Sequence, residues 1–349
     1  MENIPVQPDH ISRSPKREEG QNASQAARDV LVIRGLSIRF ASFDVLDRVD
    51  LSVRAGELVC VVGESGSGKS LTALATMGLT PDVARVTADR MTFADHDLLS
   101  LSEHQRQTLR GNEMAMIFQE PMTSLNPVMT IGEQITEPLR QHRGMSADDA
   151  RTTAIAMLRR VQISAPETRF YQYPHQLSGG LRQRVMIAMA LVCQPRLLIA
   201  DEPTTALDVT IQKQILQLVD ELRHEMGTSV LFITHDLAVV SEIADRIAVI
   251  YAGRIVEEGT RDEIFEDPQH PYTLSLFAAL PRPEDKGRDL ASIRGQVPGP
   301  GTMPAGCRFA PRCPFAIDLC HAESPPLEVL GSPTHHVACW RAPLEESVT

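Results

Sequence analysis

The sequence predicts an α/β fold in which a central parallel sheet is flanked by an antiparallel β subdomain, a helical subdomain and a loop-rich C-terminal extension. Three observations lead to this prediction. Short apolar runs alternate with helical patterns through the middle of the chain, and the apolar positions of residues 31–56 recur at every second residue. After about Asp262 the texture changes, since thirteen of the 24 prolines lie between Pro268 and Pro343.

The central sheet is predicted from three runs that are apolar at every position: Leu58–Val62, Leu197–Ala200 and Val230–Ile233. Strands buried on both faces of a parallel sheet have this composition, because helices cover both faces. A helix is expected before the third run, ending near Gly227. Its apolar residues fall at helical spacing and are Ile211, Ile215, Leu218, Val219 and Leu222. Strands and helices therefore alternate, as in α/β domains.

Other regions flank that sheet. Residues 31–56 alternate apolar and polar side chains, which is typical of half-buried antiparallel strands. Residues 129–163 carry two helical patterns without a strand between them, which predicts a helical insertion. Residues 1–28 are polar, mixed in charge and without a period, so we expect this segment to be disordered.

Composition excludes several classes of function. The 349 residues carry 34 Lys and Arg against 45 Asp and Glu, a net charge of −11, and the pI is near 5.5. Such an acidic chain is a poor coat for nucleic acid, so we expect no nucleic-acid partner. No window approaches the roughly 18 consecutive apolar residues of a spanning helix, and residues 1–28 lack the apolar core of a secretory signal. The expected compartment is the cytoplasm, where thiols stay reduced.

A phosphate-binding loop is predicted directly after the first apolar run. Eight residues match Gly-x-x-x-x-Gly-Lys-Ser in full: Gly63, Glu64, Ser65, Gly66, Ser67, Gly68, Lys69 and Ser70. The glycines let backbone N–H groups wrap around phosphate, Lys69 reaches the outer phosphates, and Ser70 offers its hydroxyl to Mg²⁺. The helix expected from Leu71 onward points its positive end at the anion. This context favours a nucleotide site over a flexible Gly/Ser loop.

Two acids follow the second apolar run. The strand predicted over residues 197–200 places Asp201 beside the Mg²⁺ and Glu202 beside an attacking water. A carboxylate at the position of Glu202 orients and deprotonates water for in-line attack on a γ-phosphate. Alone, the pair predicts only a strand that ends in solvated acids. Together with the phosphate loop, it predicts nucleotide hydrolysis.

A third segment points to a family. Ser178, Gly179 and Gly180 open a predicted helix before the second run, and the segment resembles the signature of the ATP-binding cassette (ABC) ATPases. The other cassette motifs follow in the family's order. Those that resemble them are Gln119 (the Q-loop glutamine), Thr205-Ala206-Leu207-Asp208 (the D-loop), His235 (the switch histidine) and Phe40, 23 residues ahead of Gly63 (the aromatic that stacks on adenine).

The resemblance implies a P-loop NTPase of the ABC nucleotide-binding type over residues 29–262, with its helical subdomain at about 120–178. A coupling helix from a membrane permease would dock on that subdomain. Two prolines make residues 119–127 suitable for a hinge. The resemblance further implies a sandwich of two ATPase subunits, in which the signature of one chain completes the ATP site of the other.

Roles for the site residues follow from the same resemblance. ATP is the expected nucleotide and Mg²⁺ the expected metal, bound by Ser70, Gln119 and Asp201. Glu202, His235 and Gln119 are the expected catalytic residues.

The tail narrows the family. Four segments resemble the C-terminal extension of the oligopeptide/dipeptide importer ATPases, to which residues 263–349 are therefore assigned. They are His270-Pro271-Tyr272-Thr273, Ala279-Leu280-Pro281, Gly306-Cys307-Arg308-Phe309 and Arg312-Cys313-Pro314.

Partners and cargo follow from this second resemblance. It implies two integral-membrane permease subunits, a second and different ATPase subunit and an extracytoplasmic substrate-binding protein. The chain itself would be peripheral, at the cytoplasmic face of the inner membrane. Di- and oligopeptides are the expected cargo. Relatives import nickel, glutathione or other small solutes, so these cargoes stay open, as does a soluble ABC ATPase without a transport role.

Four of the six cysteines crowd into the tail: Cys307, Cys313, Cys320 and Cys339. Cys60 and Cys193 lie in apolar runs and are expected to pack in the core. A zinc site usually starts from a Cys pair about two to four residues apart, which is lacking, and disulfides do not persist in a reducing cytosol. Four thiolates in a loop-rich segment suit an iron–sulfur cluster, and some members of the resembling subfamily bind a 4Fe–4S cluster at such cysteines. A cluster is the expectation; zinc, and thiols that only pack, stay open.

Overall fold

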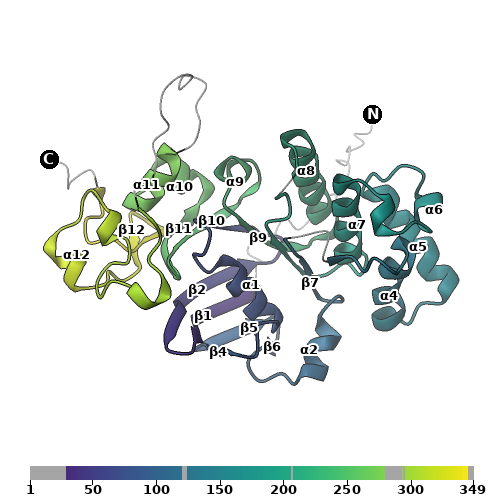
Figure 1. Ribbon diagram of the computed structural model, residues 1–349, viewed down its shortest axis with the longest axis horizontal. Coiled ribbons are helices and arrows are strands. Elements are labelled where there is room, and N and C mark those ends of the chain that lie inside the picture. The colour runs from purple at the N-terminus through teal and green to yellow at the C-terminus, as the bar shows by residue number, and fades with distance from the viewer. Residues whose placement is uncertain (1–28, 120–123, 206, 280–292, 294, 345–349) are drawn as a thin grey trace, which may run out of the picture.

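The structure, a computed structural model, describes residues 29–119, 124–205, 207–279, 293 and 295–344. An eight-stranded sheet divides them into two apolar cores, with an antiparallel sheet and helix α1 (Lys69–Met77) on one face and most of the other helices on the opposite face (Figure 1). This confirms the predicted α/β class. Residues 1–28, residues 120–123 of the expected hinge, Ala206, Leu280 and Pro281 lie outside the described residues.

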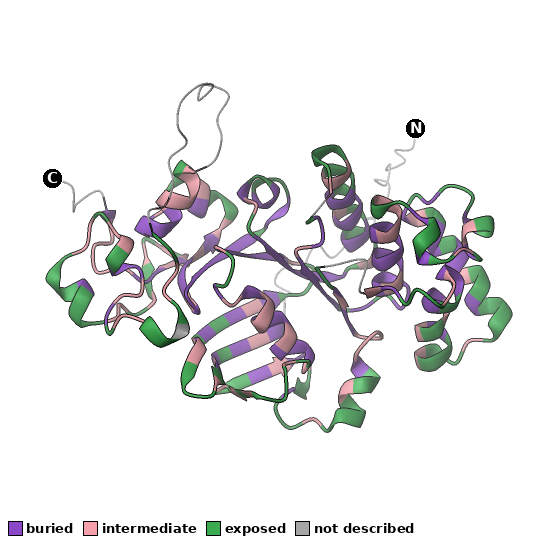
Figure 2. Ribbon diagram, in the orientation of Figure 1, coloured by how far each residue is buried: buried purple, intermediate pink, exposed green. Residues whose placement is uncertain are grey.

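The eight-stranded sheet has the order β12-β13-β11-β10-β3-β9-β8-β7, and the five strands from β10 to β7 run parallel. Strands β3, β8, β9 and β10 are buried at every residue (Figure 2), because both faces of the sheet are covered. The three continuously apolar runs of the sequence are therefore confirmed as central strands. The bounds are β3 Leu58–Val62, β7 Met114–Ile117, β8 Leu197–Asp201, β9 Ser229–Thr234, β10 Arg246–Tyr251, β11 Arg254–Thr260, β12 Glu328–Leu330 and β13 Ser332–Val337.

The antiparallel sheet has the order β2-β1-β5-β6, with β4 also paired to β1. β2 buries mainly alternate residues, as the period of two in the sequence predicts, whereas β1 departs from this period where Val30–Leu31 and Gly35–Leu36 are buried in succession. Leu31, Ile33 and Leu51 point into the core that this sheet shares with α1. The bounds are β1 Asp29–Phe40, β2 Phe43–Arg54, β4 Ala84–Thr87, β5 Arg90–Phe93 and β6 His96–Asp97.

The helices begin and end where local chemistry favours it. α8 (Val209–Met226) begins after Asp208, whose carboxylate accepts from the Ile211 N–H, and ends at Gly227 with φ 66°. α4 (Ile131–Arg143) begins with a capping box of Thr130 and Glu133. The other helices are α2 Glu103–Leu109, α5 Ala147–Arg160, α6 Pro166–Arg169, α7 Gly179–Leu191, α9 Leu237–Ile243, α10 Arg261–Glu266, α11 Pro271–Ala278 and α12 Asp318–Ala322.

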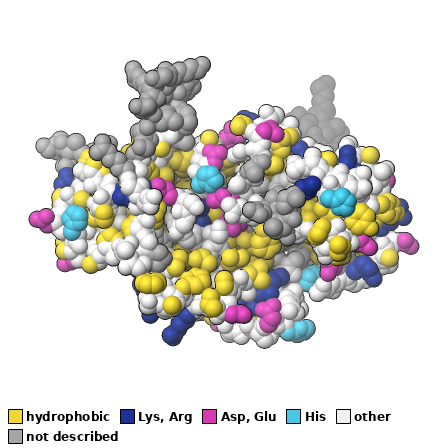
Figure 3. Space-filling model, in the orientation of Figure 1, with side chains coloured by type: hydrophobic (Ala, Val, Ile, Leu, Met, Phe, Trp, Pro, Cys, Tyr) yellow, Lys and Arg dark blue, Asp and Glu magenta, His cyan; other side chains and the backbone are white. Residues whose placement is uncertain are grey.

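In the part of the chain that the structure describes, none of the helices combines the length and the apolar character of a membrane-spanning segment. On the face shown in Figure 3, apolar side chains gather towards the middle, and acidic and basic side chains are interspersed around them.

The C-terminal extension joins the central sheet, which the sequence did not indicate. β13 pairs with β11, so that Val337 lies opposite Glu257. Glu257 is fully buried, and its carboxylate accepts from the Gln269 N–H at 2.6 Å and from the His270 N–H at 3.1 Å, and contacts His335 Nε2 at 2.9 Å. A buried carboxylate is stable only with such partners, so this network ties the extension to the cassette.

Candidate nucleotide site

The predicted phosphate loop connects β3 to α1. Gly66 and Gly68 have positive φ angles of 78° and 101°, which favour glycine. A Cβ at Gly63 would lie 2.1 Å from the Ile250 carbonyl oxygen, so the strand packs too closely for another residue. The Lys69 ammonium donates to the Gly63 and Glu64 carbonyls at 2.7 and 3.0 Å. Burial lowers the pKa of Lys69, although the nearby carboxylates of Glu202 and Asp201 act to raise it.

Of the three residues expected to bind Mg²⁺, Ser70 and Asp201 are in direct contact. Ser70 Oγ donates to Asp201 Oδ1 at 3.0 Å, at the point where α1 begins and β8 ends. Burial raises the pKa of Asp201, while the hydrogen bond from Ser70 opposes this. A hydroxyl and a carboxylate are the oxygen donors that Mg²⁺ prefers, and its octahedral demand suits a site completed by phosphate oxygens. Ser67 Oγ, fully buried, has no hydrogen-bond partner in the described part of the chain, which fits a loop whose polar groups bind an anion.

Glu202 is the centre of a second group. Its carboxylate accepts from Gln119 Nε2 at 3.0 Å and from Thr205 Oγ1 at 3.1 Å, and lies 3.2 Å from His235 Nδ1. The backbone of Glu202 has φ 45°, in the left-handed region, which costs free energy for a residue other than glycine. The structure thus brings Gln119, Glu202 and His235 together. The sequence pattern predicted Thr205 only as part of the D-loop, and its hydrogen bond to Glu202 was not expected.

The signature residues lie apart from the phosphate loop. Ser178, Gly179 and Gly180 open α7, which is well separated from α1 in Figure 1. Ser178 and Gly179 are exposed, and a Cβ at Gly179 would meet no atom within 4 Å. Within the described residues, the hydroxyl of Ser178 caps no N–H of its helix. This helix end therefore faces open space, with its donors available to another molecule.

Two aromatic side chains, Phe40 and Phe43, lie at the hairpin turn that joins β1 to β2. Phe40 packs partly buried against the core of the antiparallel sheet. Phe43 lies opposite Phe40 across the hairpin turn and is 45% exposed, beside Gly301 of the extension. Phe40 was predicted from its spacing to Gly63 as the aromatic residue that stacks on adenine, but the more exposed ring is that of Phe43.

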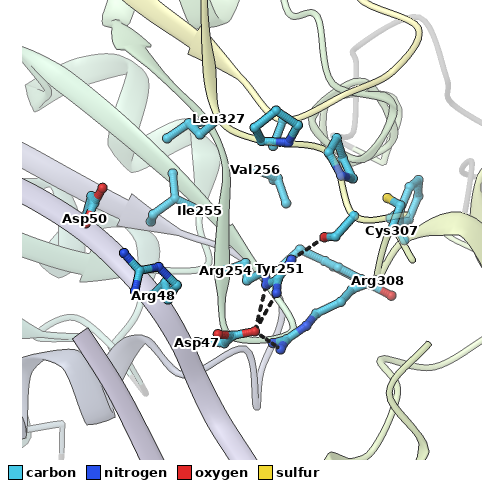
Figure 4. A pocket seen from close by; sticks show the side chains of 15 residues that line it. Asp47, Arg48, Asp50, Tyr251, Arg254, Ile255, Val256, Cys307, Arg308 and Leu327 are labelled. Carbon is cyan, nitrogen blue, oxygen red and sulfur yellow. Dashed lines mark hydrogen bonds and ion pairs between the residues drawn. The ribbon is translucent and has the colours of Figure 1, made fainter. Parts of the chain in front are cut away.

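The extension also contacts the antiparallel sheet. Arg254 and Arg308 both donate to Asp47 Oδ2 at 2.6 Å, one from β11 and one from the tail (Figure 4). This joint borders a cavity of about 430 Å³ between β2, β11 and the tail. Arg308 also donates to the Ala252 carbonyl. The tail is thus held to the antiparallel sheet by partly buried charges.

The expected iron–sulfur cluster is wrong. Among the residues that the structure describes, no group of three or more His, Cys, Asp or Glu is arranged to hold a metal ion. Cys307, Cys313, Cys320 and Cys339 line one cavity of only about 10 Å³, room for about one water. Burial raises the pKa of Cys313 and Cys339 to about 11, as expected for thiols packed among apolar groups. These thiols pack as small apolar groups.

Comparison with known proteins agrees with this geometry. A family model for ABC transporters matches residues 46–205, and one for the C-terminal region of oligopeptide/dipeptide transporters matches residues 256–320. The chain is 52% identical to the dipeptide transport ATP-binding protein DppD of Escherichia coli, over 86% of this chain and 94% of that protein. It is 53% identical to the oligopeptide transport ATP-binding protein AppD of Bacillus subtilis, over 81% and 86% respectively.

Solved structures give the same fold. A dimeric ATP-binding cassette bound to ADP and Pi is 28% identical, with a TM-score of 0.59 over 66% of this chain and 98% of that chain. The cbiO1 protein of Clostridium perfringens, part of an ABC transporter complex, is 25% identical with a TM-score of 0.60, over 68% and 91%.

The sheet order, the phosphate loop and the acids after β8 define an ABC-type ATPase. Within that class, the chain belongs to the family of ATP-binding subunits of dipeptide and oligopeptide ABC transporters. ATP and Mg²⁺ are the ligands of this family.

Proposed function

We propose that the chain is the energy-coupling subunit of an importer for di- and oligopeptides, hydrolysing ATP at the site built around Glu202. The observation that carries the proposal is the convergence of Gln119 and His235 on the Glu202 carboxylate, next to the Ser70–Asp201 pair. The names of two relatives, a dipeptide and an oligopeptide transport ATP-binding protein, support the cargo.

The groups in the site divide the work. Lys69 and the N–H groups of the phosphate loop bind the β- and γ-phosphates of ATP. Ser70, Asp201 and Gln119 would hold Mg²⁺, which when bound neutralises developing charge on the phosphates. Glu202 orients a water and takes its proton as the water attacks the γ-phosphorus in line with the leaving oxygen. His235, which directly follows β9 and has a side chain 59% exposed, would contact the γ-phosphate.

A second cassette completes the site. The exposed α7 end supports a sandwich in which Ser178, Gly179 and Gly180 contact ATP held by a partner subunit. The partner is proposed to be a different chain. Closure on ATP and reopening after hydrolysis is the movement that drives transport.

Permease subunits are proposed to dock beside Gln119. A groove of about 290 Å³ lies there, lined mainly by apolar side chains from β7, α7 and the end of α1. Phe118 at its rim is 40% exposed. A helix of a permease fits such a groove, and Gln119 links it to Glu202. Two permease subunits, an extracytoplasmic substrate-binding protein and a position at the cytoplasmic face of the inner membrane complete the proposed assembly.

The proposed division of the chain assigns residues 29–262 to the cassette, about 120–178 to its helical subdomain and 263–349 to the extension.

Uptake into proteoliposomes tests the proposal. Vesicles that contain the assembled complex should accumulate a labelled dipeptide or oligopeptide when ATP is supplied on the side of this subunit, and vesicles with Glu202→Gln should not. Uptake of labelled nickel and of labelled glutathione is measured separately, as the two alternative cargoes. Uptake of either one without uptake of peptide would contradict the proposed cargo.

A further inference from the structure

The tail of the chain reaches the phosphate loop through two side chains. Arg312 Nη1 donates to Glu64 Oε2 at 2.6 Å, and its Nη2 donates to Glu64 Oε1 at 3.0 Å. The hydroxyl of Tyr272, from α11, accepts from the Glu64 backbone N–H at 2.8 Å. Both the carboxylate and the N–H of one loop residue are therefore bound by the extension. A two-point Arg–carboxylate contact fixes orientation as well as distance.

Arg312 is itself rigidly held. Its side chain is 4% exposed, and Nη1 also donates to the Tyr251 hydroxyl at 3.2 Å. The guanidinium lies over the rings of Tyr251 and Phe309, 5.6 and 5.9 Å from their centroids. Since packing and hydrogen bonds already fix this fork, little entropy is lost when it binds Glu64.

Glu64 passes this restraint into the loop. Its carbonyl oxygen accepts from the Ser67 N–H at 3.2 Å and from Lys69 Nζ at 3.0 Å. A displacement of Glu64 therefore disturbs the turn around Ser67 and the ammonium that binds the outer phosphates. The Glu64 N–H is bound to the Tyr272 hydroxyl, so in this arrangement it is not a donor for phosphate.

We propose that Arg312 is a positioning residue of the nucleotide site: from the C-terminal extension it fixes Glu64, and through Glu64 it holds the phosphate loop and Lys69 ready for ATP. The inference rests on the proposed ATPase function of this site. It gives the extension a role in ATP affinity.

The test compares variants of this chain within the assembled complex. Arg312→Met removes the fork while keeping an apolar stem, and Arg312→Lys keeps the charge but loses the two-point contact. Arg308→Met is the matched control, because Arg308 also anchors the tail but contacts Asp47 and the Ala252 carbonyl instead of the phosphate loop. We expect Arg312→Met to raise the KM for ATP about tenfold with kcat within about twofold, and Arg312→Lys to restore part of the loss. Arg308→Met should leave KM within about twofold.

A double variant shows whether the effect passes through Glu64. Glu64→Gln with Arg312→Met should raise KM no further than the larger single effect, since both remove one contact. An unchanged KM in Arg312→Met, or equal effects of Arg312→Met and Arg308→Met, would overturn the inference while leaving the ATPase function intact. A wild-type complex that hydrolyses no ATP would instead overturn the proposed function.

Discussion

The side-chain amide of Gln119 donates a hydrogen bond to the Glu202 carboxylate across 3.0 Å, and so connects the residue after the apolar groove with the acid after β8. One end of this contact lies where a permease is proposed to dock, and the other is the proposed base. A shift of the groove therefore reaches the base through one side chain.

Loss of the Gln119–Glu202 contact should weaken the coupling between the permease at the groove and ATP hydrolysis at Glu202. Gln119→Ala in the complex is expected to lower basal ATP turnover, because a proposed Mg²⁺ ligand is lost, and to lower the peptide-stimulated rate about tenfold further, because the link to the groove is cut as well. Stimulated and basal ATPase rates measure this, with the exposed Gln141→Ala as the control. Equal loss of both rates would show that Gln119 acts only in the chemical step.

Removal of the base should separate binding from hydrolysis. Glu202→Gln keeps the size of the side chain but cannot accept a proton, so turnover is expected to fall at least about a hundredfold with ATP affinity little changed. Single-turnover hydrolysis and equilibrium ATP binding check this. The control is Glu221→Gln, an exposed carboxylate on α8. Turnover near that of wild type would contradict the assignment of Glu202.

The signature should act on the site of a partner. Ser178→Arg introduces a long cation at the exposed start of α7, so we expect the assembled complex to lose most ATP turnover. ATP binding by the isolated chain should be unchanged, because its own phosphate loop is untouched. Ser164→Arg, exposed in the same helical region, is the control. Loss of ATP binding by the isolated Ser178→Arg chain would speak against a shared site.

Acid should loosen the joint between extension and cassette. Burial lowers the pKa of His270 from 6.5 to about 4, although Glu257 opposes this. Since the unfolded chain takes up this proton more readily, the stabilisation from neutral His270 is fully present above about pH 6.5. It is lost progressively as the pH falls to about 4, and amounts to at most about 3 kcal/mol.

His270→Asn tests this dependence. Asn keeps an acceptor for the Tyr272 N–H at the start of α11 but does not titrate, so the fall in melting temperature from pH 6.5 to 4 should be shallower than in wild type. His335 keeps its raised pKa in both proteins, so their difference reports His270. His224→Asn, exposed on α8, should retain the wild-type slope.

Local patterns in the sequence predicted the parts of the fold and site that are encoded locally. The apolar runs at Leu58–Val62 and Leu197–Ala200, and the loop between Gly63 and Ser70, need only neighbouring residues to be recognised. The sequence predicted that Ser70 and Asp201 both bind Mg²⁺, because a strand-end acid and a phosphate loop together define one chemistry. Their direct hydrogen bond of 3.0 Å comes from the structure.

Contacts between distant segments could not be predicted in this way. Arg312 binds Glu64 across 248 residues and Tyr272 binds it across 208, and no period or spacing signals such pairs. The pairing of β13 with β11 could not be predicted either, because the sequence of β13 is short and rich in polar residues. The cysteine prediction failed because spacing along the chain does not determine how side chains are arranged in space: within the described residues no metal-binding group forms, and the cavity between the four cysteines is only about 10 Å³.

The most direct test of the peptide-importer function is the ATPase rate of the complete complex, reconstituted with its permeases and substrate-binding protein, with and without a mixed peptide pool. The account predicts that peptide raises the rate several-fold in wild type and leaves the Glu202→Gln complex inactive. A chain that hydrolyses ATP rapidly alone, joins no permease and does not respond to peptide would contradict it.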